Sequence, residues 1–189
     1  MISKILSSAV LGVDAYIVEV EVDLAFGVPQ FNTVGLPEGA VKESKERVRA
    51  AIKNCGYEFP ARRITVNLAP ADIRKEGSAF DLPISLGILS ATGLVEQDHL
   101  QDYVILGELS LDGKVKPVRG ALPSSIRARD NRLKGIILPR ENAEEAAVVD
   151  GIEALAVETL QETVEFLSGK RVIEPTVIDV DSVFSTARS

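Results

Sequence analysis

The chain has one cysteine, one histidine and no tryptophan among its 189 residues. A single cysteine excludes an internal disulfide, and a single histidine excludes a zinc site built from histidine and cysteine alone. His99 lies in a polar stretch and is expected at the surface. Aromatic residues make up only 5% of the chain, whereas hydrophobic residues make up 46%. A substantial core is therefore available, and it must be largely aliphatic.

Long hydrophobic runs are also missing. No run approaches the roughly 18 apolar residues of a membrane span, and the N-terminus lacks the small-residue cleavage site of a signal peptide. These absences predict a cytoplasmic protein with no membrane partner. The net charge of −7 argues against a domain that coats nucleic acid by charge alone. The charge is uneven, however: residues 38–76 hold nine basic and six acidic side chains, so they could form either a basic patch or ordinary solvated helix faces.

Alternating apolar and polar residues over 15–25 predict a half-buried strand, paired as a hairpin with an apolar stretch that ends at Gly12. The first helix places Cys55 on one face with Val48 and Ile52, so Cys55 is interpreted as a core residue rather than a nucleophile. Strand and helix alternate after residue 60, which indicates layered α/β architecture with crossovers. We expect further strands at 31–34, 63–68, 103–111, 114–117, 135–138 and 154–157, and helices at 39–54, 78–92, 124–131, 142–149 and 160–167.

The pattern fades after Gly169. We therefore expect one domain over residues 1–170 and a linker or unpacked tail over 171–189. A tail of this kind would lead toward a further domain that this chain does not contain.

A phosphate-binding loop of the Walker A type is not found. The nearest approach starts at Gly107 and has five residues instead of four before Gly113. It also carries Val115 where a magnesium-binding hydroxyl is needed, and it falls on a predicted hairpin. We expect no ATP, cofactor or metal site in this chain.

Ser78 is the side chain in the most suggestive position. It follows Gly77 at the predicted start of a buried helix, where free N–H groups and the positive end of the helix dipole lie. It is interpreted either as a helix N-cap or as a nucleophile that uses a lysine as its base. The second interpretation needs no histidine.

Several segments together resemble a known family. They are Lys75 to Ile84 (Lys-Glu-Gly-Ser-Ala-Phe-Asp-Leu-Pro-Ile), Gly107 to Gly113 (Gly-Glu-Leu-Ser-Leu-Asp-Gly), and residues 8–12, 34–37 and 66–70. They resemble the N-terminal, Lon-protease-like domain of magnesium-chelatase-like AAA+ ATPases of the competence protein M and YifB type. The resemblance implies an α+β, ribosomal protein S5 domain 2-like fold with a mixed sheet. The same fold is found in the Lon proteolytic domain and in the C-terminal domain of the RadA recombination protein.

The resemblance also implies a role for the whole protein. Such proteins are hexameric AAA+ ATPases that use ATP and Mg²⁺ and act on DNA as branch-migration helicases in natural transformation and recombination. The leading hypothesis is therefore a non-catalytic accessory domain that supports ring assembly, DNA contact or both. The candidate DNA contacts are Arg62, Arg63, Arg74 and Lys75, because arginine suits phosphate.

Two alternatives concern catalysis. Ser78 matches the catalytic serine of Lon, but the matching lysine position, two residues after Gly120, is occupied by Leu122, which cannot accept a proton. The dyad is broken, so a serine–lysine peptidase would need a displaced lysine. A magnesium-chelatase subunit is the second alternative, although few aromatics are present to stack a porphyrin. The lysines nearest in sequence to Leu122 are Lys114, Lys116 and Lys134, and none of them falls at the matching position.

Overall fold

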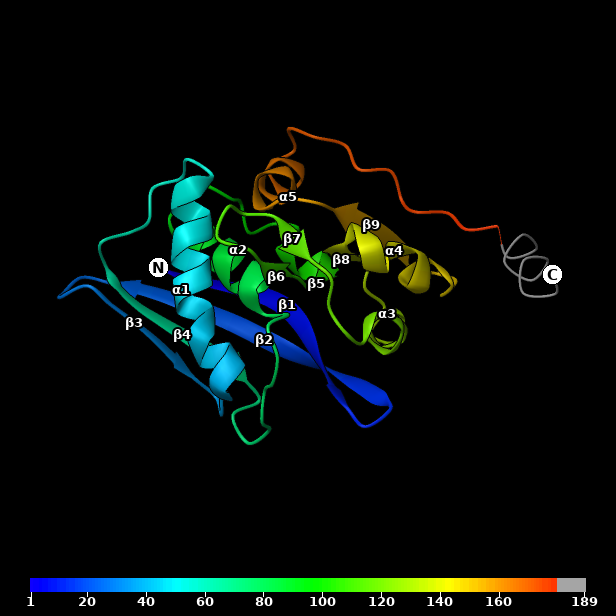
Figure 1. Cartoon of the computed structure of the whole chain (residues 1–189), viewed down its shortest axis with the longest axis horizontal. Helices are drawn as coiled ribbons and strands as arrows, with labels where there is room; N and C mark the ends of the chain where they lie inside the picture. The colour runs from blue at the N-terminus through cyan, green and yellow to red at the C-terminus, as the bar shows by residue number, and fades with distance from the viewer. Residues whose placement is uncertain (180–189) are drawn as a thin grey trace.

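Two long strands at the N-terminus pair as an antiparallel hairpin in the middle of the sheet. The computed structural model describes residues 1–179 (Figure 1). Strand β1 spans Ile2–Leu11 and β2 spans Asp14–Ala25. The alternation in β2 buries Val18, Val20 and Val22 on one face. The hairpin predicted from the period-two pattern is therefore confirmed.

Seven strands form one mixed sheet in the order β3-β4-β2-β1-β5-β8-β9. The β1–β2 and β2–β4 pairs are antiparallel, and the other four neighbouring pairs are parallel. A separate two-stranded ribbon joins β6 to β7. The bounds are β3 Gln30–Val34, β4 Arg63–Ala69, β5 Tyr103–Ile105, β6 Glu108–Leu109, β7 Val115–Lys116, β8 Gly135–Pro139 and β9 Glu153–Val157.

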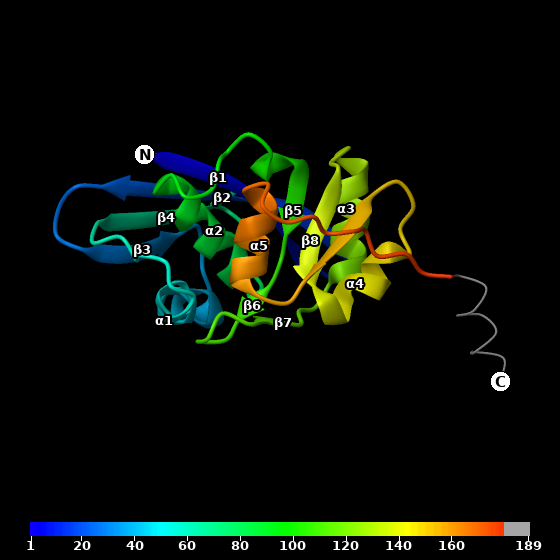
Figure 2. The ribbon, with the colours of Figure 1, turned by 90° about the horizontal axis from the view of Figure 1, so that it is seen from above.

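Helices cover both faces of the sheet (Figures 1 and 2). Helices α1 (Gly39–Asn54), α2 (Asp81–Ala91) and α5 (Leu160–Leu167) enclose the larger core. Helices α3 (Ala121–Asp130) and α4 (Arg140–Ala147) enclose a smaller core. Neighbouring strand residues divide between the two cores, since Ile105 belongs to the larger and Val104 to the smaller. The predicted layered α+β fold is confirmed.

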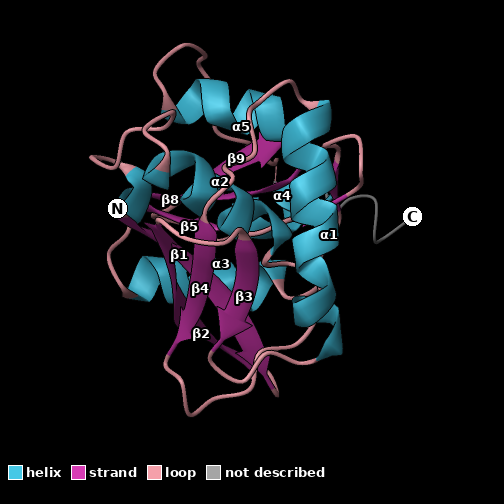
Figure 3. Cartoon of the chain, turned by 90° about the vertical axis from the view of Figure 1, so that its left-hand side faces the viewer, coloured by secondary structure: helices cyan, strands magenta, loops and turns pink. Residues whose placement is uncertain are grey.

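Helix α1 runs beside the part of the sheet formed by β2, β4 and β3 (Figure 3). Its bounds agree with the prediction, and Val41, Val48 and Ile52 are fully buried. Cys55 ends the helix half-buried and packs against the larger core, as expected. A 3₁₀ helix, η1 (Leu100–Asp102), precedes β5.

Several predicted boundaries differ, among them the start of α3 at Ala121 instead of 124, and Gly107 explains two of them. The strand expected over 103–111 splits into β5 and β6, and the helix expected from residue 78 begins at Asp81. The Gly107 N–H donates to the Ala79 carbonyl at 2.9 Å, and the Gly107 carbonyl accepts from the Leu82 N–H at 3.0 Å. The backbone between β5 and β6 thus bonds to the segment at the start of α2 instead of continuing the sheet.

The predicted tail begins close to where regular structure ends. Residues 171–179 contain no helix or strand, although Ile173 packs against the larger core. The Thr176 N–H donates to the Ala154 carbonyl at 2.8 Å. Residues 180–189 of the predicted tail lie outside the described residues. Within residues 1–179, no helix is both long enough and apolar enough to cross a membrane.

Candidate functional site

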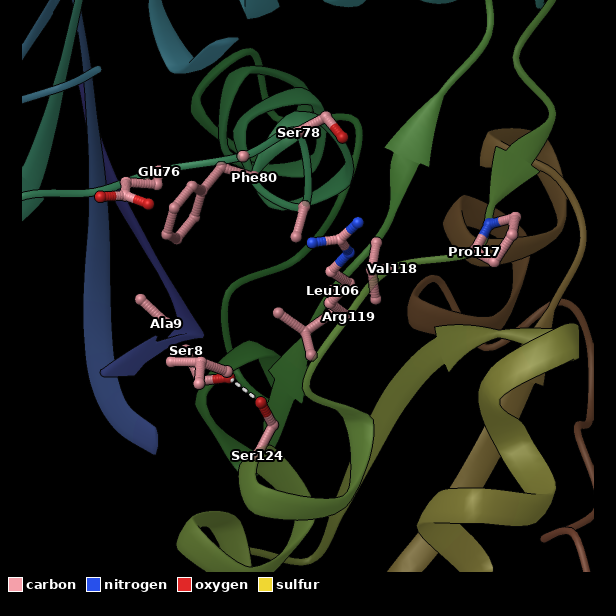
Figure 4. A pocket seen from close by; sticks show the side chains of 13 residues that line it. Ser8, Ala9, Glu76, Ser78, Phe80, Leu106, Pro117, Val118, Arg119 and Ser124 are labelled. Carbon is pink, nitrogen blue, oxygen red and sulfur yellow. Dashed lines mark hydrogen bonds between the residues drawn. The ribbon is translucent and has the colours of Figure 1, made fainter. Parts of the chain in front are cut away.

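A cavity of about 570 Å³ lies between β1, the segment before α2 and the segment that leads into α3. Figure 4 shows Ser78 on one wall and the hydrogen-bonded pair of Ser8 and Ser124 on another. The Ser8 hydroxyl donates to the Ser124 hydroxyl oxygen at 2.6 Å. The lining also includes Glu76, Gly77, Arg119 and the apolar residues Ala9, Val10, Ala79, Phe80, Leu106, Pro117 and Val118. The cavity is the place where the predicted nucleophile would act.

Ser78 lies in a turn before α2 and not at the helix cap. The residue at the cap position is Phe80, which makes no side-chain cap hydrogen bond, and the Asp81 N–H donates to the Ser78 carbonyl at 3.2 Å. Gly77 enters this turn with a φ of 81°, a left-handed conformation that glycine adopts without strain. The N-cap interpretation of Ser78 is therefore wrong, because Ser78 lies in the turn before the helix and its hydroxyl does not cap α2.

No lysine lines this cavity among the described residues. The cation at its wall is Arg119, whose guanidinium stays protonated and cannot act as a base. Leu122 lies in the first turn of α3, and its N–H donates to Glu145 Oε1 at 3.3 Å. The position that resembles the Lon lysine therefore carries no proton acceptor near Ser78.

Lys75 is the lysine nearest to Ser78 in sequence, and it is fully buried. Its ammonium group donates to the Gly35 carbonyl at 2.8 Å and also to the Pro70 carbonyl. Burial lowers the pKa of this ammonium group, and the charge of Asp72 opposes that change. Lys75 ties the loop after β4 to the loop after β3. The expectation that Lys75 contacts DNA is corrected, because a phosphate cannot reach the buried ammonium group.

The three predicted arginines lie at two separate places. Arg62 precedes β4 and Arg63 begins it, whereas Arg74 lies beyond its far end. A seven-residue strand is about 20 Å long, so the structure does not bring Arg74 together with the other two. Arg74 is exposed and pairs with Glu38 at 3.4 Å. The Arg62 guanidinium lies over the Phe26 ring, 4.2 Å from its centroid.

Asp81 is the polar group that sequence reasoning missed. Its side chain is fully buried at the start of α2 and accepts from Ser44 Oγ at 2.6 Å, from Arg47 Nε at 2.7 Å and from the Leu109 N–H at 3.0 Å. It therefore joins α1, α2 and β6 behind the cavity wall formed by Phe80. An acidic residue inside the otherwise apolar 80–91 segment is the sequence signal that could have identified it.

The remaining candidate motifs do not come together as a site among the described residues. Residues 107–116 form the β6–β7 ribbon with a turn at Asp112 and Gly113. This is the predicted hairpin, and a hairpin does not suit a phosphate-binding loop. His99 is exposed and lies 3.2 Å from Asp102. Within residues 1–179, no three histidine, cysteine or acidic side chains gather in a way that could hold a metal ion.

The chain was compared with known proteins. Residues 20–142 match the family model of subunit ChlI of Mg-chelatase. Competence protein ComM of Haemophilus influenzae is 43% identical over 164 residues, which cover 87% of this chain and 32% of ComM. YifB of Escherichia coli is 42% identical over 173 residues, which cover 92% of this chain and 34% of YifB.

Lon protease 2 of Bacillus subtilis is more distant, at 32% identity over 125 residues, which cover 66% of this chain and 22% of that protease. The chain thus spans about a third of the length of the ComM and YifB relatives. The family model covers more than half of the chain and agrees with the motifs over residues 75–84 and 107–113. The chain belongs to the ChlI, or magnesium-chelatase-like, family.

Proposed function

We propose that this chain is a non-catalytic accessory domain of a hexameric AAA+ ATPase that acts on DNA in the cytoplasm. The observation that carries the proposal is the cavity lined by Ser78, Ser8, Ser124 and Arg119, to which none of the described lysines contributes. A frame similar to that of the Lon protease but without the lysine base of its dyad suits assembly or binding better than hydrolysis. ATP and Mg²⁺ would be bound by a separate module of the full-length protein.

DNA contact is proposed for the end of the sheet where β4 begins. Arg62 and Arg63 are adjacent there, with Arg63 exposed and Arg62 half-buried. Changing both to Glu in the full-length protein should weaken duplex and single-strand binding about tenfold or more, since two phosphate contacts become repulsive. Arg74→Glu at the other end of β4 reports whether that end contributes. Unchanged affinity in the double variant, with the assembly intact by sedimentation, would refute DNA contact by this domain.

A serine peptidase is the second candidate, because Ser78 faces a cavity and a Lon protease is among the relatives. The decisive comparison is hydrolysis of fluorescent casein by the wild-type protein and by Ser78→Ala. Turnover that disappears in the variant would replace the accessory role by catalysis. We expect no turnover in either.

A further inference from the structure

The surface around the loop between β2 and β3 combines an exposed aromatic ring with several cations. Phe26 is 85% exposed, and Val28 in the same loop is 74% exposed. In Figure 1 this loop lies at the left-hand end of the molecule, away from α3 and α4. We call this surface the Phe26 platform and define it as Phe26, Arg49, Lys53 and Arg62.

A hydrogen bond and a ring contact hold the platform together. The Arg62 carbonyl accepts from the Gln30 N–H at 3.3 Å, which fixes the backbone of Arg62 beside the loop. Its guanidinium covers one face of the Phe26 ring at 4.2 Å, and the high exposure of Phe26 leaves the opposite face open. A planar cation on one face and open solvent on the other give a surface on which a flat, electron-rich ring can stack.

The other cations lie around a hollow next to the ring. Arg49, Lys53 and Arg62 line a hollow of about 220 Å³, together with Phe59 and Gln30. The Arg49 guanidinium lies 5.4 Å from the centroid of Phe59, so packing holds it in place. Glu46 neutralises part of the Arg49 charge at 3.5 Å.

Arg63, the residue after Arg62, projects from the opposite face of the sheet, because Ile64 beside it is buried in the larger core. It is exposed and pairs in the sheet with Ala25, the residue before Phe26. Glu58 lines the neighbouring hollow, which shares Arg62 with the first. Arg49, Lys53 and Arg62 therefore lie beside the two acids Glu46 and Glu58, which leaves a local charge of +1 at this end of an acidic chain.

We propose that the Phe26 platform binds unpaired nucleotides of single-stranded DNA, with a base stacked on Phe26 and phosphates on Arg49, Lys53 and Arg62. The inference rests on the proposed DNA-acting function and names the form of DNA that this end of the sheet selects. Bases in a duplex are already stacked on each other, so an exposed ring gains a partner only from an unpaired strand. Contact through a base face and through phosphates reads no base edge, so binding is expected to tolerate any sequence.

The lack of tryptophan in this chain allows a direct test. Phe26→Trp introduces the sole tryptophan on the platform, and Val13→Trp places it at an equally open site, 89% exposed, in the β1–β2 turn. We expect single-stranded oligothymidine to quench the fluorescence of Phe26→Trp and to leave Val13→Trp unchanged. Absence of quenching in Phe26→Trp when the oligonucleotide is bound would overturn the proposal.

Affinity provides the second measurement, by fluorescence anisotropy on labelled single-stranded and duplex DNA. Phe26→Ala should weaken single-strand binding about fivefold or more and change duplex binding by less than about twofold. Arg62→Glu should weaken both, whereas Arg132→Glu, an equal change of charge between α3 and β8, should weaken neither by a comparable factor. An equal loss for single-strand and duplex binding in Phe26→Ala would overturn the stacking role.

The outcomes also separate this inference from the proposed function. If the wild-type chain and the full-length protein bind no DNA, the proposed DNA contact fails and the platform fails with it. If DNA binds but Phe26→Ala changes only the oligomeric state in sedimentation, the platform is an interface between protein chains and this inference alone is refuted.

Discussion

Removing the Asp81 carboxylate should be among the most destabilising single changes in this chain. The carboxylate is fully buried and accepts from the Ser44 hydroxyl, from two nitrogens of Arg47 and from the Leu109 N–H. In Asp81→Ala the Arg47 guanidinium, only 22% exposed, loses its counter-charge at 2.7 Å and keeps the longer pair with the exposed Glu43 at 3.8 Å. The loss of one partner from a buried ion pair costs about 3–5 kcal/mol, and an unpaired buried N–H costs about 1–3 kcal/mol.

These contributions overlap, because all of the donors share one acceptor. We therefore expect Asp81→Ala to lower the free energy of unfolding by about 4 kcal/mol and not by the sum of its parts. Urea denaturation followed by far-UV circular dichroism measures the change. The Asp81→Asn side chain keeps the shape and one oxygen acceptor, so it should lose about half as much.

A double-mutant cycle with Arg47→Met tests the cause of the loss. Arg47→Met removes the charge that Asp81 neutralises, so Asp81→Ala should cost at least about 1.5 kcal/mol less in that background. Additive losses would show that Asp81 and Arg47 do not stabilise each other. A loss below about 1 kcal/mol in Asp81→Ala alone would refute the account of the network as a whole.

Three further predictions concern single residues. Gly35→Ala should destabilise the fold by about 2 kcal/mol or more, because Gly35 has a φ of 103° and an added Cβ would clash with the Leu68 carbonyl oxygen. Gly39→Ala is the control, since a Cβ there meets open space and should not destabilise the fold. Thermal denaturation compares the two variants. Burial raises the pKa of the Cys55 thiol, so its alkylation at mildly alkaline pH should be slower in the native chain than in urea, and equal rates would contradict this burial. The same shift should reduce the free energy of unfolding as pH rises above the ordinary pKa of a thiol, because the unfolded chain then releases its proton more readily. Lys75→Met should lower the free energy of unfolding by about 2 kcal/mol in urea denaturation, and a neutral result would show that its two carbonyl contacts do not stabilise the loop.

Elements with a strong local period could be predicted from the sequence. Strand β2 and helix α1 each bury one face, so their apolar side chains recur with the period of a strand or of a helix. That period predicts the type of each element and much of its extent. Helix α2 is different, because every residue from Asp81 to Ala91 is buried. A helix buried on all sides has no periodic signal at its ends. Its start was fixed instead by the backbone of Gly107, which is distant in sequence.

The site shows the same limit for charged side chains. A lysine is almost always exposed, so Lys75 between Arg74 and Glu76 was predicted to face solvent. The acceptors that bury it are the carbonyls of Gly35, 40 residues away, and Pro70. Asp81 likewise meets Arg47, which is 34 residues away. Neither partner is visible in a local pattern, so burial of both charges depends on tertiary structure.

The position of Ser78 is therefore weak evidence for catalysis by itself. A peptidase would need its serine at the edge of a cavity, and Ser78 lines one here. Yet each contact that fixes the turn also serves folding: Gly107 satisfies buried backbone groups at the start of α2, and Asp81 neutralises Arg47 behind Phe80. The geometry around a nucleophile can thus persist for reasons of stability, and chemistry at Ser78 depends on a base, for which Leu122 offers no atom.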